Sequence, residues 1–387
     1  MAEAYIVAAR RTAGGRRNGR LAGVHPADLG AASVNAVLAE TGLDPAAVED
    51  VIFGCVTQAG EQASHIGRHV VLASNLPQSV PAVSIDRQCG SSQQAVHFAA
   101  QAIMSGTQDI VLAGGVESMS RVPMRLAHMT EQGYDQLSPA IHERYGVQEF
   151  SQFTGAAMIA AKWGYTRERL DRFALSSHQK AIAATKEGAF AKEIVPVPVT
   201  LPDGTKMMHE VDEGIRFDAS YESISAVKLL DPNGIISAAN ASQITDGSSA
   251  VLVVSEKALN EHRLAPLARI HSLTVTAGDP VVMLEEPLYA TEKALRKAGL
   301  KLDDIDLFEV NEAFASVPMA WQRELGADPA KLNVNGGAVA LGHPLGCTGA
   351  KLTATILHEM QRRQARYGMV TMCVGGGMGA AGIFERI

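Results

Sequence analysis

The chain has 387 residues, of which 47% are hydrophobic and 19% charged, which is typical of a soluble globular protein of two or three domains. Its formal net charge of −7 argues against a nucleic-acid partner, and no uninterrupted apolar run is long enough to cross a membrane. The four cysteines, at positions 55, 89, 347 and 373, form no CxxC pair, so neither a disulfide framework nor a metal site is indicated. The charges near the N-terminus follow a short apolar run, the reverse of a secretory signal, and we therefore expect a cytoplasmic location.

The first part of the chain alternates strand and helix patterns. Residues 5–9 predict a strand, and residues 26–41 predict a helix that ends at Gly42. The stretch 42–56 predicts a turn, a short helix and a strand, and residues 64–76 predict another helix. This rhythm is typical of an α/β fold.

Cys89 lies at the centre of the next unit. An apolar run at 82–85 predicts a strand, a polar turn follows, and Cys89 then begins a helix that ends near Gly106, before a strand at 110–113. A thiol at a helix N-terminus lies among unpaired N–H groups, which favour the thiolate and can hold an oxyanion. A single cysteine is also commonly a small buried hydrophobic residue, so this stretch alone leaves both interpretations open.

From about residue 118 the alternation is lost. Residues 118–245 are rich in Met, His and charged residues, with helices expected at 151–163 and 167–187, and we interpret them as an inserted lid. Regular order returns with a strand at 250–255 and a helix directly after it.

An internal repeat indicates a duplicated architecture. The sequence GLDPAAVEDVIF at 42–53 has a counterpart, GLKLDDIDLFEV, at 299–310. The unit around Cys89 also has a counterpart, in which we expect a strand at 332–334, a Gly-rich turn, a helix at 350–364 and a strand at 369–374. Each unit ends in glycines, Gly114-Gly115 in the first and Gly375-Gly376-Gly377 in the second. We therefore expect two α/β halves whose strand ends face each other at the active site.

Three reactive side chains follow strands or lie in Gly-rich loops of the second half. Asn311 follows a strand, where it can hold a water or an oxyanion, or merely form a turn. His343 lies in the loop GHPLGCTG, where it can act as base to a thiol, and we expect Cys347 to pack inside. Cys373 is near the end of a strand, and a second thiol is suited to proton transfer at carbon.

The sequence GMGAAG at 377–382 matches the GxGxxG pattern of dinucleotide-binding proteins. Only five residues follow it, too few for the phosphate-binding helix, and no acidic residue lies about 20 positions later. We therefore reject a dehydrogenase and expect a closing strand here.

These pieces resemble the thiolase family, of the 3-ketoacyl-CoA thiolase and acetyl-CoA acetyltransferase type. The matching motifs are DRQCGSS, AGGVESMS, NAS with a following DG, VNEAF, GHPLGCTGA and CVGGGMG, in family order along the chain. The resemblance implies a duplicated five-layered αβαβα fold with an inserted loop domain. Its halves would be residues 1–117, completed by 246–264, and residues 265–387, with the loop domain at 118–245. The implied reaction is CoA-dependent thiolytic cleavage of a 3-ketoacyl-CoA to acetyl-CoA and a shortened acyl-CoA.

The resemblance also implies the catalytic roles. Cys89 would be the acylated nucleophile, His343 its base, and Cys373 the acid and base at the α-carbon. Asn311, through a water, would act with His343 to hold the thioester oxygen. The backbone N–H groups of Cys89 and Gly375 would hold the oxygen of the acyl-cysteine.

Coenzyme A would be a co-substrate, with no cofactor bound permanently. Arg216, Ser223 and Ser242 fall where the family contacts nucleotide and pantetheine, and Ala313 and Phe314 where it lines the pantetheine channel.

An acidic chain needs local cations to bind an anionic nucleotide, and we expect Arg216, Lys228 and Arg121 to supply them. The family also implies a homo-oligomer. We expect a dimer, or a dimer of dimers formed through the loop at 120–145.

Two departures from the family wording lie where the acyl chain should pass. Gln93 and Gln94 follow the nucleophile, and the segment around Ala157 and Met158 differs as well. Similar wording occurs in thiolases of lipid and steroid breakdown, so we expect a degradative enzyme of fatty-acid or steroid catabolism. The alternatives are a ketoacyl synthase acting on a carrier protein, which would pair its Cys with two His, and a non-catalytic acyl-CoA binder. The retention of all three reactive residues argues against the binder.

Overall fold

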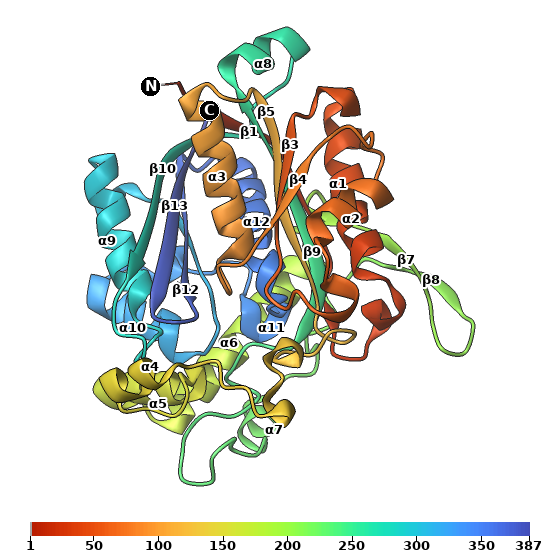
Figure 1. Cartoon of the computed structure of the whole chain (residues 1–387). Coiled ribbons are helices and arrows are strands. Elements are labelled where there is room, and N and C mark those ends of the chain that lie inside the picture. Colours follow the sequence, from red (N-terminus) through yellow and green to blue (C-terminus); the bar gives the residue numbers. More distant parts are fainter. Residues whose placement is uncertain (1) are drawn as a thin grey trace.

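The structure, a computed structural model, describes residues 2–387, and its centre is one large mixed sheet made of two halves (Figure 1). From the outer edge inward, the first half consists of β4 (Ala82–Ile85), β3 (Asp50–Gly54), β5 (Ile110–Ser118), β9 (Thr245–Ser255) and β1 (Ala4–Thr12). The second half, in the same direction, consists of β11 (Leu307–Val310), β12 (Tyr367–Val374), β13 (Met378–Arg386) and β10 (Ala268–Ala277). Antiparallel pairing of β1 with β10 joins the halves.

The two halves repeat each other in strand direction as well as in order. β3 and β5 are parallel, as are β11 and β12, whereas β9 is antiparallel to both of its neighbours, as β13 is to its own. Even an irregularity recurs, because the register shifts between Ile6 and Ala8 in β1 and between Ile270 and Ser272 in β10. The duplication predicted from the sequence is thus confirmed, and so is β13 as the closing strand.

The prediction of a strand at 332–334 was wrong. Leu332 makes only a single bridge to Phe308. Asn333 then adopts a positive φ of 43°, and its side chain takes over the pairing. Its Oδ1 accepts from the Val310 N–H at 2.8 Å, and its Nδ2 donates to the Val310 carbonyl at 2.9 Å. An amide side chain thus replaces the backbone ladder at the edge where β4 lies in the first half.

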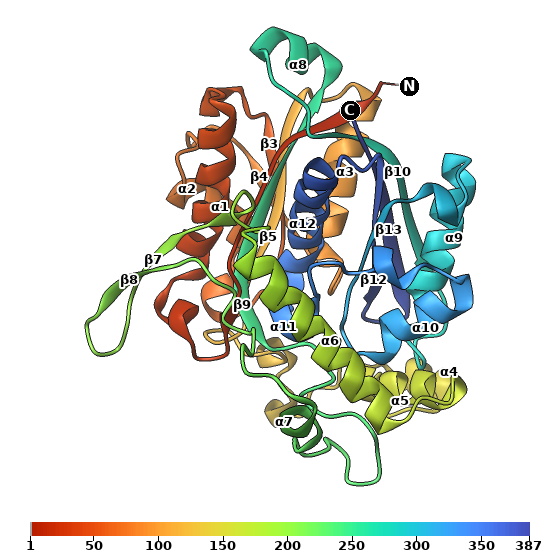
Figure 2. The same ribbon diagram turned by 180° about the vertical axis from the view of Figure 1, so that it is seen from behind.

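Helices separate and cover the two half-sheets, giving the expected five layers (Figures 1 and 2). The middle layer consists of α3 (Ser91–Ser105) and α12 (Thr348–Arg363), packed in one apolar cluster with both half-sheets. One outer layer consists of α1 (Pro26–Thr41) and α2 (Ile66–Ala73), and the other of α9 (Glu286–Ala298) and α10 (Ser316–Leu325). The short helix α8 (Glu256–His262) follows β9. Helices α1 and α3 end where predicted, at Gly42 and Gly106 in the left-handed region.

The segment between β5 and β9 covers one end of the sheet (Figure 1). It contains α4 (Pro139–Tyr145), α5 (Gln152–Lys162), α6 (Arg167–Lys186) and α7 (Tyr221–Ser225). It is also joined to the first half, because β6 (Ile194–Val195) pairs with β1, and the hairpin of β7 (Val197–Thr200) and β8 (Lys206–His209) contributes to the core there. The two-residue strand β2 (Gly15–Arg16) pairs with β9. In residues 2–387, no helix is both long and apolar enough to cross a membrane.

One further predicted detail differs. Gly114 and Gly115 do not follow a strand but lie inside β5, which runs to Ser118. The lack of a side chain at Gly115 lets β5 pack against the second half, because a Cβ there would lie 2.1 Å from the Gly346 carbonyl oxygen.

Candidate active site

Cys89 is presented by a tight turn between β4 and α3. Gln88 has a positive φ of 46°, and Asp86 Oδ1 accepts from its N–H at 2.6 Å. Ser91 closes the turn, since its Oγ accepts from the Arg87 N–H at 2.9 Å and donates to the Gln88 carbonyl at 2.6 Å. The hydrogen bonds of this turn therefore fix where the thiol points.

The thiol of Cys89 is protonated at rest. Burial raises its pKa to about 11, although hydrogen bonds from the backbone N–H groups of Gly375 and of Cys89 itself lower it. The backbone N–H groups therefore favour the thiolate, as expected, but the effect of desolvation on the pKa is larger. A base is needed to remove the proton when the sulfur attacks.

Cys373 and Gly375 come to Cys89 from the second half. Cys373 is buried near the end of β12, and burial first, then the neighbouring Cys89, raises the pKa of its thiol. Gly375 begins the glycine turn after β12 and packs against Gln88, since a Cβ on it would lie 3.2 Å from Gln88 Cγ. Two thiols and two backbone donors thus meet where the halves face each other.

His343 lies in the loop between α11 (Ala338–Leu341) and α12, and its hydrogen bonds fix its tautomer. Its Nδ1 lies 2.6 Å from Thr348 Oγ1, which is 2.9 Å from the Pro344 carbonyl. Because that carbonyl can only accept, Thr348 donates to it and Nδ1–H donates to Thr348. The lone pair is left on Nε2. Burial and then Lys351 lower the pKa of His343 to about 3, so the imidazole is neutral and can accept a proton.

Asn311 directly follows β11 and faces His343. Its Nδ2 lies 3.4 Å from His343 Nε2, and its backbone N–H donates to the Thr371 carbonyl at 3.0 Å. The buried Oδ1 of Asn311 has no hydrogen-bond partner within residues 2–387. An unpaired buried acceptor is costly, so this atom is suited to hold a water or a substrate group.

The helices that follow Cys89 and His343 start side by side. Ser92 Oγ accepts from the Ala350 N–H at 2.9 Å, and a Cβ on Gly349 would lie only 2.2 Å from the Gln93 nitrogen. A glycine at position 349 therefore permits the contact that brings the two loops together.

Three of the five residues expected to bind coenzyme A gather at one place. Ser242 N–H donates to the Ala313 carbonyl at 2.9 Å, and Phe314 packs edge-on against Phe153. Ala313 and Phe314 belong to the same apolar cluster as Cys373, so this wall continues to the second thiol.

The other two, Arg216 and Ser223, are exposed on the segment between β5 and β9. The Ser223 hydroxyl is already engaged, because it caps α7 together with Ser220. Arg121 is not available as a phosphate cation, since its guanidinium pairs with Glu61 and donates to the Ala22 carbonyl at 3.0 Å.

The residues that depart from the family wording divide into two kinds. Gln93 and Gln94 are buried, and in the part of the chain that the structure describes neither Oε1 has a partner. Met158 is exposed, and Ala157 packs against the cluster that contains Cys373.

Sequence reasoning missed the residues that support these groups. Thr348 could have been found as the polar residue of GHPLGCTG nearest the helix start. Glu117, within AGGVESMS, accepts from the N–H groups of Val56, Thr57 and Gly346 at 2.9, 3.0 and 2.9 Å, and so ties the His343 loop to the first half. No local signal indicated that contact.

Comparisons with known proteins cover both halves of the chain. A family model described as the thiolase N-terminal domain matches residues 4–257, and one described as the thiolase C-terminal domain matches residues 264–386. The chain is 51% identical to a steroid 3-ketoacyl-CoA thiolase of Mycobacterium tuberculosis, over 100% of this chain and 95% of that protein. It is 43% identical to a 3-ketoacyl-CoA thiolase of Bacillus subtilis, over 100% of both. Human mitochondrial 3-ketoacyl-CoA thiolase has a similar solved structure, with a TM-score of 0.91 and 38% identity over 100% of this chain and 99% of that one.

Proposed function

The chain belongs to the thiolase family, and we propose that it cleaves 3-ketoacyl-CoA thioesters through an acyl-Cys89 intermediate. One observation carries the assignment of roles. The Cys89 thiol, the Gly375 N–H and the Cys373 thiol meet at facing strand ends, and the neutral imidazole of His343 lies on the loop before α12, whose start contacts the start of α3.

In the first half-reaction, Cys89 sulfur attacks the 3-keto carbon while His343 Nε2 takes its proton. The N–H groups of Cys89 and Gly375 hold the developing oxyanion. The C2–C3 bond then breaks, leaving the acyl group on Cys89 and the enolate of acetyl-CoA. Cys373 donates its proton to C2 and becomes a thiolate, and acetyl-CoA is released. Asn311, through a water on its free Oδ1, stabilises the enolate oxygen.

In the second half-reaction, free CoA removes the acyl group. The proton held by His343 first restores the Cys373 thiol. His343 then takes the proton of the CoA thiol as its sulfur attacks the acyl-cysteine, and returns that proton to Cys89 as the sulfur leaves. The products are a shortened acyl-CoA and the free enzyme, so every proton is accounted for.

We infer that coenzyme A lies along the Ser242–Ala313–Phe314 wall, with Arg216, Ser223 and Lys228 near its nucleotide. The acyl group is bulky or ring-derived rather than a simple straight chain. The 51% identity to a protein named a steroid 3-ketoacyl-CoA thiolase supports this substrate class, as do the departures at Gln93 and Gln94. The reaction runs in the degradative direction.

We also propose three units and a homo-oligomer. The first half is residues 1–117 with 246–264, the loop domain 118–245, and the second half 265–387. Edge strand β4 supports a dimer, because its outer side pairs with no strand of residues 2–387 and Val83 on it is 41% exposed. The exposed apolar side chains of Leu126, Met129 and Tyr134 in the loop 120–145 support a dimer of dimers. Light scattering at micromolar protein tests this, and a stable monomer would contradict it.

The reaction is tested with a panel of 3-ketoacyl-CoA substrates and free CoA. Mass spectrometry should find acetyl-CoA and an acyl-CoA two carbons shorter, with the highest kcat/KM for ring-derived acyl groups. Cys89→Ala should give no product, whereas Cys55→Ala, a matched buried cysteine of the first half, should stay active. Absence of cleavage across the panel would refute the proposed function, and a preference for straight chains would refute the substrate class.

A further inference from the structure

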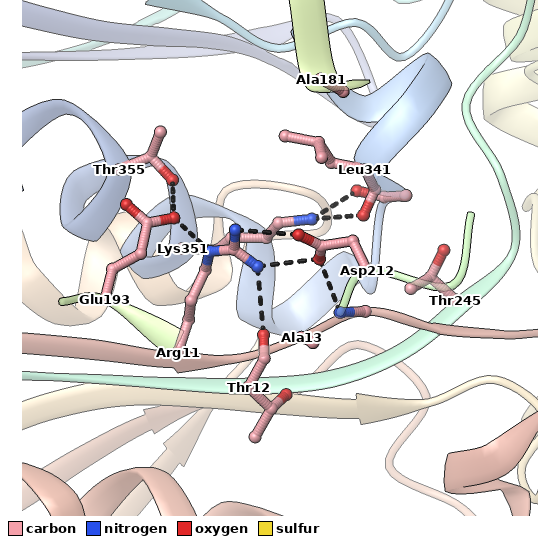
Figure 3. A network of polar contacts seen from close by, with 12 residues as sticks. Arg11, Thr12, Ala13, Ala181, Glu193, Asp212, Thr245, Leu341, Lys351 and Thr355 are labelled. Carbon is pink, nitrogen blue, oxygen red and sulfur yellow. Dashed lines mark hydrogen bonds and ion pairs between the residues drawn. The ribbon is translucent and has the colours of Figure 1, made fainter. Parts of the chain in front are cut away.

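A group of buried charges lies close to Leu341, two residues before His343 in the chain (Figure 3). Arg11 on β1 is fully buried and pairs with Asp212 through two hydrogen bonds, at 2.8 and 3.0 Å. It also pairs with Glu193 at 2.5 Å, and Glu193 accepts from Thr355 on α12 at 3.0 Å. Lys351, also on α12, is the second cation of the group. Both halves and the inserted segment therefore contribute to one network with two positive and two negative charges.

Lys351 donates its hydrogen bonds to backbone carbonyls. Its Nζ donates to the Leu341 carbonyl at 2.6 Å and to the Gly342 carbonyl at 2.9 Å (Figure 3). Burial lowers the pKa of Lys351 to about 8, although Asp212 opposes this. An ammonium kept in the core at such a cost requires a reason, and two backbone carbonyls do not need a charged donor.

The Gly342–His343 peptide is the feature that these contacts hold. Lys351 binds its carbonyl, while the His343 N–H donates to the Gln243 carbonyl at 3.1 Å and to Thr245 Oγ1 at 3.2 Å. Gly342 has φ 78° and ψ 164°, a conformation open essentially only to glycine, and a Cβ there would lie 2.1 Å from Thr245 Oγ1. A backbone this unfavourable persists only when its surroundings hold it at several points.

We propose that Lys351 is a positioning residue for the general base, since its buried ammonium fixes the peptide that carries His343 and sets a positive charge behind the imidazole. This inference rests on the role proposed for His343 above. Asp212, which Arg11 holds through two hydrogen bonds, is the carboxylate whose charge favours the ammonium, whereas the charge of Arg11 itself opposes it.

The positive charge of Lys351 affects how kcat depends on pH, because it acts on the pKa of His343. Asp212, Arg11, Glu193 and Cys347 face Lys351, and Lys351 is the charged group that lowers the pKa of His343 after burial itself. Removing this positive charge makes the imidazolium less unfavourable, so the pKa of His343 rises. The acidic limb of the kcat profile should therefore move to higher pH.

The test compares Lys351→Met with Lys331→Met. Lys331 is a matched control because its Nζ also donates to two carbonyls, those of Ile305 at 2.8 Å and Asp303 at 3.3 Å, away from the His343 loop. Lys351→Met should lower kcat for thiolysis by about 10- to 100-fold, the scale of a small misplacement of a catalytic group, with KM for CoA within about twofold. Its acidic limb should move upward. Lys331→Met should change neither, and Lys351→Arg should recover part of the loss.

A folded Lys351→Met enzyme with wild-type kcat and pH profile would overturn the inference. If that variant fails to fold, Thr245→Val replaces it, since it removes one acceptor of the His343 N–H and leaves every buried charge. It should lower kcat without moving the acidic limb, and an unchanged kcat would overturn the inference. The wild-type enzyme keeps the two proposals distinguishable, because an inactive wild type contradicts the proposed function and not the role of Lys351.

Discussion

The two halves of the sheet have the same strand order, directions and register shift, but different chemistry at equivalent places. In the first half, β4 leads through a turn to Cys89, and β5 continues to Ser118 and into the long segment that precedes β9. In the second half, β12 ends at Val374 and returns through three glycines directly into β13, with Cys373 and Gly375 at the turn. The two halves thus present equivalent strand ends that face each other, and the loops at these ends carry different functional groups. In the mechanism that we propose, the first half holds the nucleophile, and the second holds the base and the carbon acid.

The close packing of the halves is the feature whose loss should have the largest effect on stability. In Gly115→Ala, the new Cβ would lie 2.1 Å from the Gly346 carbonyl oxygen, a backbone atom that cannot move alone. We expect the free energy of unfolding to fall by about 3 kcal/mol, as for severe overpacking. Gly23→Ala is the control, since the nearest atom to its Cβ would be 3.7 Å away, and should change stability by less than about 0.5 kcal/mol. Equal denaturant unfolding curves would show that the halves do not depend on this contact.

A change confined to the second half should affect the base alone. Thr348→Val removes the acceptor of His343 Nδ1–H, so the imidazole loses the bond that fixes its tautomer. We expect kcat to fall by about 10- to 100-fold with little change in KM for CoA. Thr348→Ser keeps the hydroxyl and should stay within about threefold of the wild type. Equal kcat values for Thr348→Val and Thr348→Ser in steady-state kinetics would refute the tautomer assignment.

The long segment after β5 has no counterpart in the second half, and a change there should affect binding rather than chemistry. Arg216→Ala should raise KM for CoA about tenfold with a smaller loss of kcat, as expected when uniform binding is removed. Arg121→Ala should leave KM unchanged, because that guanidinium is already paired with Glu61. A wild-type KM in Arg216→Ala would remove Arg216 from the CoA site.

The fold could be predicted because the repeat at 42–53 and 299–310 reports the same local structure twice. The strand at 332–334 could not, since an apolar pattern does not reveal that the Asn333 side chain replaces a backbone ladder. The candidate site could also be located, because its cysteines and histidine lie on loops at strand ends, several of them rich in glycine. Ordering a glycine-rich loop costs conformational entropy, so such a loop indicates that a ligand must approach the backbone closely.

The electrostatics of the site could not be predicted from the sequence. The helix N-terminus before Ser91 favours a Cys89 thiolate, but burial has the larger effect on the pKa of the thiol. Burial depends on the whole fold and not on the local sequence. The sequence indicated Arg121 as a cation for a phosphate, but its guanidinium forms an ion pair with Glu61, 60 residues earlier in the chain. Lys351 gave no local sign of its contacts, because its neighbours Arg11 and Asp212 come from other parts of the chain.

The division of labour between the halves is tested most directly by two reactions of Cys373→Ala. Thiolysis of a 3-ketoacyl-CoA needs a proton delivered to carbon, so this variant should lose about 10²- to 10⁴-fold, the scale of a general acid. Exchange of labelled CoA into acetyl-CoA passes only through acetyl-Cys89 and His343, so it should remain near the wild-type rate. Cys89→Ala, as the reference, should abolish both reactions. Equal losses of thiolysis and exchange in Cys373→Ala would contradict the assignment of the carbon acid to the second half.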